Sequence, residues 1–184
     1  KQVLYTSWET GFPQIYLLSL ETGRRKRVNT PGNGVAFSPR FSPNNERIVF
    51  SYERDGNIDI YLMELNSLRS ARLTSSPFID TAPSFSPDGR KIVFESDRSG
   101  AQQLYILPVT GGAPKRISFG NGRYGTPVWS PRGDLIAFTK QSNGRFGIGV
   151  MRIDGTKERL LSASFLDEGY AAQWSYSGNT SNGT

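Results

Sequence analysis

The feature that most constrains this chain is an internal repeat of about 44 residues. An aromatic residue followed by Ser-Pro occurs at Phe41, Phe85 and Trp129, and a degraded copy of the motif occurs at Trp174. These aromatic residues lie 44, 44 and 45 positions apart. A period of this length is typical of arrays in which each repeat is one supersecondary unit that buries its apolar face against its neighbour.

Each repeat carries the signals of four short strands. After the motif comes an apolar strand that ends at Phe50, Phe94 or Phe138, and then a polar turn closed by glycine. A second apolar strand and a short basic strand follow, and helical periodicity is absent throughout. Four strands in about 44 residues are typical of a propeller blade. The sequence therefore predicts an all-β protein, a β-propeller of four-stranded antiparallel blades.

The two ends of the sequence complement each other. Residues 3–28 have the pattern of the last three strands of a blade, and residues 171–174 have the pattern of a first strand. We therefore expect one domain over residues 1–184, closed by pairing of the C-terminal strand with the N-terminal blade, which would remove exposed sheet edges. Its four blades would comprise residues 1–34 plus 170–178, 35–78, 79–122 and 123–169. The alternative is a fragment of a six-bladed ring.

The residues that recur in every repeat are predicted to be structural. Ser86–Gly89 is a turn, in which the proline presets φ, Asp88 bonds the backbone and Gly89 takes the left-handed conformation. Asp88 is replaced by Asn44 and Arg132 in the other repeats, which argues against a catalytic or metal-binding role for this carboxylate. The recurring aromatic residues are predicted to form the core between blades.

Composition argues against catalysis and metal binding. The chain contains no cysteine and no histidine, so it has no disulfide, no thiolate metal site and no Ser-His-Asp triad. Asp167 and Glu168 are adjacent, so in a strand they would point to opposite faces and could not flank one bond. We predict that the chain is not an enzyme and holds no cofactor or metal.

Charge and hydropathy indicate neither a nucleic-acid partner nor insertion into a membrane. The formal net charge is +6, but the cations are dispersed and only residues 24–27 form a basic run. That run has the position of a solvated turn and edge strand, which we favour over a nucleic-acid patch. No apolar stretch approaches the roughly 20 residues that a membrane-spanning helix needs.

The segments that lead into the first strand of each repeat vary most. They mix aromatic, arginine and acidic side chains, which are frequent in protein interfaces, and in a propeller they lie at one mouth of the central channel. A scaffold keeps its repeated residues for packing and varies the loops that meet a partner. We therefore expect a partner-binding site in these loops, to which Asp167 and Glu168 also belong.

Two motifs resemble one known family. Residues 86–100 are similar to the repeat of the TolB propeller, and residues 117–140 are similar to TolB of alphaproteobacterial type. The resemblance covers about residues 1–169. Since family members have six blades and an N-terminal α/β domain, the resemblance implies a truncated or rearranged propeller that lacks this domain.

The resemblance also implies a function. Family members belong to the periplasmic Tol–Pal cell-envelope system and bind the peptidoglycan-associated lipoprotein Pal at the channel mouth, a site that some bacteriocin segments also use. In the family the contacts come from residues just before the proline of the inner strand. The corresponding residues here are Val35, Phe37, Ile79, Asp80, Thr81, Ala82, Arg123, Tyr124, Gly125 and Thr126.

Two other functions remain open on the sequence. Similar blades occur in propellers attached to peptidases, so the chain could be the non-catalytic propeller of a peptidase-like enzyme. It could also be a scaffold that has kept no partner.

Overall fold

The computed structural model describes residues 1–164, and this part of the chain is built from fifteen strands without a helix. None of the described residues therefore belongs to a helix long and apolar enough to cross a bilayer. The strands form four separate antiparallel sheets. The predicted all-β class is confirmed.

Each sheet is one blade, and its strands follow one another in sequence order. The first blade has three strands: β1 (Gln2–Ser7), β2 (Gln14–Ser19) and β3 (Arg25–Arg27). The second has four: β4 (Val35–Phe41), β5 (Arg47–Arg54), β6 (Asn57–Glu64) and β7 (Ser70–Arg72). The third comprises β8 (Asp80–Phe85), β9 (Lys91–Ser96), β10 (Gln103–Pro108) and β11 (Lys115–Arg116). The fourth comprises β12 (Arg123–Trp129), β13 (Leu135–Ser142), β14 (Arg145–Arg152) and β15 (Arg159–Ser164).

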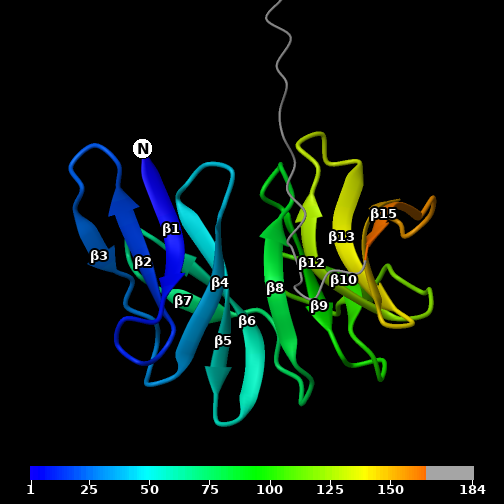
Figure 1. Cartoon of the computed structure of the whole chain (residues 1–184). Coiled ribbons are helices and arrows are strands. Elements are labelled where there is room, and N and C mark those ends of the chain that lie inside the picture. Colours follow the sequence, from blue (N-terminus) through cyan, green and yellow to red (C-terminus); the bar gives the residue numbers. More distant parts are fainter. Residues whose placement is uncertain (165–184) are drawn as a thin grey trace, which may run out of the picture.

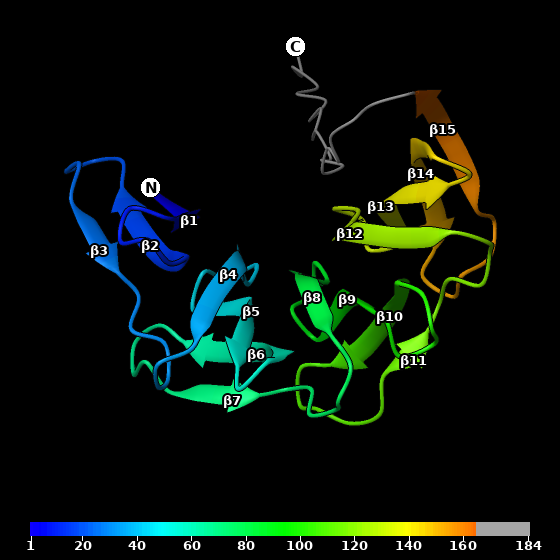
Figure 2. The same ribbon diagram turned by 60° about the horizontal axis from the view of Figure 1, so that its bottom comes forward.

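The four blades stand side by side along an arc (Figure 1). Figure 2 shows that β4, β8 and β12 lie on the inside of the arc, whereas β3, β7, β11 and β15 lie on its outside. The inner strands β4, β8 and β12 contact one another in that order. Among the described strands, those of the first blade make no contact with those of the fourth. Blades of four antiparallel strands around a common centre confirm the predicted β-propeller.

The core consists of apolar clusters between neighbouring blades. Phe50, Phe94 and Phe138 occupy the same place in the second, third and fourth blades, and each is fully buried. Phe94, for example, packs with Val49 and Ile60 of the preceding blade. The second, third and fourth blades thus present their recurring phenylalanine to the blade before them, and the first three present aliphatic side chains to the blade after them. The prediction that the recurring phenylalanines form the core between blades is confirmed.

The inner strands share a bulge that joins neighbouring blades. The residue before the inner-strand proline has a left-handed backbone in all three cases, with φ of 51° at Ser38, 51° at Ala82 and 45° at Thr126. The pairing with the next strand shifts at this point in each blade. The Ala82 N–H donates to Ser51 Oγ of the preceding blade at 3.1 Å, and the Thr126 N–H donates to Glu95 Oε2 at 3.0 Å. These two bonds hold the bulges of β8 and β12, and β4 repeats the same strained backbone at Ser38.

The Ser-Pro turns have the predicted structural role. Ser86 Oγ donates to Asp88 Oδ1 at 2.5 Å and accepts the Lys91 N–H at 2.9 Å. Gly89 closes the turn with a left-handed φ of 68°. The hydrogen bond from Ser86 lowers the pKa of the Asp88 carboxyl. Asp88 therefore serves the local turn, as the sequence predicts.

The first blade lacks an inner strand within the described residues, since only β2 pairs with β1. The segment predicted to complete it, residues 171–174, lies outside the described residues. Ring closure and the assignment of residues 170–178 to the first blade therefore stay predictions.

We expect Phe94→Ala to lower the free energy of unfolding by about 3–5 kcal/mol, because it removes a fully buried aromatic side chain between two blades. The matched control is Leu20→Ala, whose side chain is 58% exposed and whose loss is expected to change stability by about 0.5 kcal/mol or less. Urea denaturation measures both. Equal effects of the two substitutions would contradict the assignment of the core to the boundaries between blades.

Candidate functional site at the propeller mouth

One end of the propeller, which we call the mouth face, carries every loop that leads into an inner strand. These loops comprise residues 28–34, 73–79 and 117–122. Because the strands are antiparallel, the hairpin loops at residues 8–13, 55–56, 97–102 and 143–144 lie at the same end. The mouth face is the lower side of Figure 1 and comes forward in Figure 2.

Exposed aromatic residues gather on the mouth face. Among the described residues, every exposed Trp or Phe lies in one of its loops: Trp8, Phe12, Phe78 and Phe119. Trp8 is 67% exposed and Phe119 is 68% exposed, and Ile79 next to Phe78 is also exposed. The Arg116 guanidinium lies 5.1 Å from the centre of the Phe119 ring, which orients that ring. Aromatic and arginine side chains of this kind anchor protein interfaces.

Below Phe78 and Ile79, a buried ion pair holds the loop in place. Asp80 is fully buried and accepts two hydrogen bonds from Arg98, at 2.9 and 2.8 Å. The Arg98 guanidinium also lies 4.9 Å from the centre of the Tyr105 ring. The Ile79 N–H donates to Asp97 Oδ1 at 2.9 Å. The hairpin at residues 97–98 thus fixes the loop while the side chains of Phe78 and Ile79 remain outside.

The loop before β12 is held by a different polar group at the same place. Tyr124 is fully buried, and its hydroxyl lies 2.9 and 2.8 Å from the two carboxylate oxygens of Glu158. Lys140 donates to Glu158 Oε1 at 2.7 Å, and its Nζ lies 4.6 Å from the centre of the Tyr124 ring. A Cβ on Gly120 would lie 2.2 Å from the Tyr124 hydroxyl, so the loop can approach this group only with glycine at that position.

Burial and hydrogen bonding shift two pKa values in this group. Burial raises the pKa of the Tyr124 hydroxyl. Burial alone would lower the pKa of Lys140, but its hydrogen bonds to Glu158 and Tyr124 raise it overall. Tyr124 therefore stays neutral and Lys140 stays charged in the hydrogen-bonded group.

The loop before β4 has a third anchor. Tyr52 accepts the Gly34 N–H at 2.8 Å and donates to the Pro31 carbonyl. Cross-strand register places the three anchors in one equivalent pair of positions, because Ala36 pairs with Tyr52, Asp80 with Ser96, and Tyr124 with Lys140. The anchor lies on the second strand of the pair at Tyr52 and on the inner strand at Asp80 and Tyr124.

The predicted contact residues within the described part of the chain fall into three groups. Ile79 and Arg123 are exposed on the mouth face. A second set is half-buried along the inner strands: Val35, Phe37, Thr81, Ala82, Gly125 and Thr126. Asp80 and Tyr124 are fully buried and anchor the loops, so their side chains position the face and do not form its surface. Asp167 and Glu168 lie outside the described residues.

Trp8, Phe12 and Phe119 were not predicted from the sequence as candidate contacts. The repeat contains a signal for some of them, because Trp8 stands where the other blades have Glu53, Asp97 and Gln141. An aromatic residue at a loop position that is polar in the other repeats cannot belong to the repeated core. The departure of Trp8 from the repeat therefore identifies a side chain that does not serve the packing of the repeated core.

The mouth face is suited to binding a partner through a surface of complementary shape. Within residues 1–164, no group of three or more His, Cys, Asp and Glu side chains could hold a metal ion. Its exposed side chains include the aromatic residues Trp8, Phe12, Phe78 and Phe119 and the cation Arg123.

The family model described as "TolB beta propeller domain" matches residues 1–179 of this chain. The chain belongs to the TolB β-propeller domain family. The predicted resemblance is therefore confirmed over nearly the whole sequence.

Individual TolB relatives match parts of the chain. The Tol-Pal system protein TolB of a Ruegeria species is 63% identical over 82 residues, which are 44% of this chain and 18% of that protein. TolB of Gluconobacter oxydans is 48% identical over 75 residues, which are 41% of this chain and 16% of that protein. The matched segments thus span less than a fifth of these relatives. Both sources are alphaproteobacteria, which agrees with the predicted type of TolB.

Solved structures of TolB proteins are also similar to this chain. The crystal structure of TolB from Acinetobacter baumannii has a TM-score of 0.80 at 32% identity and covers 91% of this chain and 42% of that chain. Enzymes share the propeller at lower identity. A prolyl endopeptidase structure has a TM-score of 0.61 at 12% identity and covers 83% of this chain and 26% of that chain, a likeness of fold alone.

We expect Asp80→Ala to lower the free energy of unfolding by about 3–5 kcal/mol, because it leaves the Arg98 guanidinium buried without its carboxylate. The control is Glu21→Ala, which removes an exposed ion pair with the N-terminus and is expected to change stability by about 0.5 kcal/mol or less. Urea denaturation measures both. A stable Asp80→Ala protein would show that Asp80 does not anchor the mouth face.

Proposed function

We propose that this chain is a non-catalytic, protein-binding propeller of the Tol–Pal system that acts in the periplasm and binds a Pal-like lipoprotein at its mouth face. The observation that carries the proposal is the gathering of exposed aromatic residues on that one face. Membership of the TolB family supports the Tol–Pal assignment.

The proposed contacts combine apolar anchors with one cation. Phe78, Ile79 and Phe119 project from two neighbouring loops, and Arg123 is exposed at the start of β12. Apolar anchors surrounded by polar groups are the usual composition of a binding hot spot. The half-buried residues Val35, Phe37, Thr81, Ala82, Gly125 and Thr126 shape the inner rim of this surface. Asp167 and Glu168, which lie outside the described residues, remain proposed contacts.

Pre-organisation supports the same proposal. Each of the three loops is fixed by its own buried polar anchor, at Tyr52, Asp80 or Tyr124. A surface fixed before binding loses less conformational entropy on association. Bacteriocin segments that bind the channel mouth in this family would meet the same residues.

Absence of histidine from the sequence favours binding over catalysis, because it removes the commonest general base. A propeller attached to a peptidase-like enzyme is the second candidate, since such enzymes share the fold. A scaffold without a partner is the third. Both alternatives predict that the mouth face has no affinity for Pal.

Titration calorimetry of the chain with the periplasmic domain of a Pal protein from an alphaproteobacterium tests the proposal. We expect saturable binding, weakened by about tenfold or more in Phe119→Ala and Arg123→Ala, because each removes an anchor of the mouth face. Leu20→Ala is the matched control, since Leu20 is an exposed apolar residue at the opposite end of the propeller, and its affinity should equal that of the wild type.

Two results would contradict the proposal. The first is the absence of saturable binding by a folded wild-type protein, which would leave the scaffold or the enzyme-linked propeller. The second is an equal loss of affinity in Leu20→Ala and Phe119→Ala, which would place the binding surface elsewhere.

A further inference from the structure

A polar pocket lies where the first blade meets the second. Its volume is about 320 Å³, at the lower end of the range of about 300–1,000 Å³ that is usual for sites that bind small molecules. The loop from β3 to β4, which crosses between the two blades in Figure 2, forms most of it. We call it the junction pocket. Its polar side chains are those of Gln14, Arg27, Asn29, Thr30 and Asn33.

The repeat shows what normally closes this junction. In the first three blades, an arginine of the outer strand pairs with a tyrosine of the strand before it, and these pairs align the neighbouring residues. Each blade then has a set of three equivalent polar residues: Arg27, Gln14 and Asn29 in the first, Arg72, Asp59 and Thr74 in the second, and Arg116, Gln103 and Ser118 in the third.

In the second blade, the hydroxyl of Thr74 closes the junction. It accepts the Ile60 N–H at 2.9 Å and donates to Asp59 Oδ1 at 3.3 Å. Arg72 donates to Asp59 Oδ2 at 2.5 Å and to the Thr74 carbonyl at 2.9 Å. Thr74 and Asp59 are buried, so the polar groups of this set satisfy one another.

The third blade closes its junction in the same way with different side chains. The Ser118 hydroxyl accepts the Leu104 N–H at 2.8 Å and donates to Gln103 Oε1 at 2.6 Å. Arg116 Nε donates to the Ser118 carbonyl at 2.6 Å, and Gln103 Nε2 donates to the Gly122 carbonyl at 3.1 Å. A small buried hydroxyl is therefore the common element of the two closed junctions.

The first blade lacks this closure. Asn29 stands in place of the hydroxyl residue and is exposed. In the described part of the chain, Gln14, Arg27 and Asn29 form no equivalent network. The connection to the next inner strand is also one residue longer, because Arg27 lies nine residues before Ala36, whereas eight residues separate the equivalent positions in the next two blades. The junction pocket results from these two departures from the repeat.

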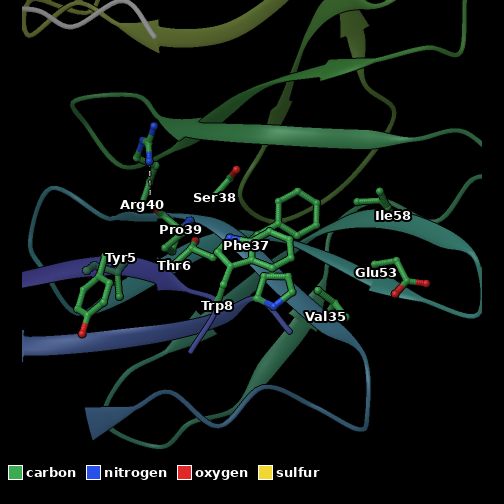
Figure 3. Close-up of a pocket in the computed structure, with 12 residues that line it drawn as sticks. Tyr5, Thr6, Trp8, Val35, Phe37, Ser38, Pro39, Arg40, Glu53 and Ile58 are labelled. Carbon is green, nitrogen blue, oxygen red and sulfur yellow. Dashed lines mark hydrogen bonds between the residues drawn. The ribbon is translucent and has the colours of Figure 1, made fainter. Parts of the chain in front are cut away.

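The polar groups of the pocket are separated from a larger apolar cavity. That cavity of about 600 Å³ lies between β1 and β4, and Figure 3 shows Val35 and Phe37 among its walls. Gly34, the residue before Val35, lines the junction pocket, and its N–H donates to the Tyr52 hydroxyl at 2.8 Å. The loop backbone is thus fixed before a ligand binds, which lowers the entropy lost on binding.

The side chains of the pocket select one class of ligand. Arg27 supplies a guanidinium and no described carboxylate lines the pocket, so an anionic group is favoured. The carboxamides of Gln14, Asn29 and Asn33 each offer both donors and an acceptor, which suits the hydroxyl groups of a sugar. A sulfate ion has only acceptors and would leave the three carboxamide oxygens without a donor.

We propose that the junction pocket binds an acidic sugar, whose carboxylate contacts Arg27 and whose hydroxyl groups contact the carboxamides of Gln14 and Asn29. The small volume of the pocket favours a single sugar unit. This inference is independent of Pal binding, because the anchors proposed for Pal lie in and beside residues 73–79 and 117–122 of other loops.

NMR titration of the ¹⁵N-labelled chain with glucuronate tests the proposal. We expect saturable shifts of the backbone amides around the pocket, and affinity for glucose weaker by about tenfold or more, since glucose lacks the carboxylate. Arg27→Ala should weaken glucuronate binding by a similar factor. The matched control is Arg24→Ala, which removes the same charge from the same basic run outside the pocket and should leave the affinity unchanged.

Asn29→Thr gives a second readout, because it restores the hydroxyl residue of the closed junctions. We expect it to weaken glucuronate binding by about tenfold or more while the melting temperature stays the same or rises. The proposal would be overturned by the absence of saturable shifts in the folded wild type, by glucose or inorganic sulfate binding as tightly as glucuronate, by equal losses in Arg27→Ala and Arg24→Ala, or by unchanged binding in Asn29→Thr.

Discussion

Packing of one blade against the next is the interaction on which the rest of this structure depends. A single sheet of three or four short strands has two faces and cannot bury both within itself. At each of the three boundaries, aromatic residues such as Phe94 meet aliphatic residues such as Val49 and Ile60 of the preceding blade. Because the 44-residue period places these residues at equivalent positions, the same packing occurs at all three boundaries between blades.

The same repetition explains why the loops are free to differ. The bulge, with its bond to the preceding blade in β8 and β12, fixes the path of the inner strand, so the residues just outside it need not contribute to the core. One cross-strand pair at the mouth of the second, third and fourth blades then supplies a different anchor in each, Tyr52, Asp80 with Arg98, or Tyr124 with Lys140 and Glu158. Each anchor fixes its own loop, and the aromatic side chains that those loops expose give the mouth face its distinct character.

The sequence predicts the strands, the turns and the core between blades because these features are local or follow the period. It does not predict that Asp80 and Tyr124 are buried, since their partners Arg98 and Glu158 lie 18 and 34 residues away and no motif links them. It also does not mark Trp8 and Phe119 as contacts, because neither lies at an aromatic position that recurs. Comparison of equivalent positions, Trp8 against Glu53 and Asp97, is the step that separates an exposed aromatic residue from a packed one.

Amide hydrogen exchange of the chain, measured by mass spectrometry with and without the Pal periplasmic domain, tests the proposed binding surface most directly. We expect slower exchange in residues 73–79 and 117–122 of the mouth face when Pal is present. We expect unchanged exchange in residues 65–69 and 109–114 at the opposite end of the propeller. Protection confined to the opposite end, or no protection anywhere at a saturating concentration of Pal, would contradict the claim that the mouth face is the binding surface.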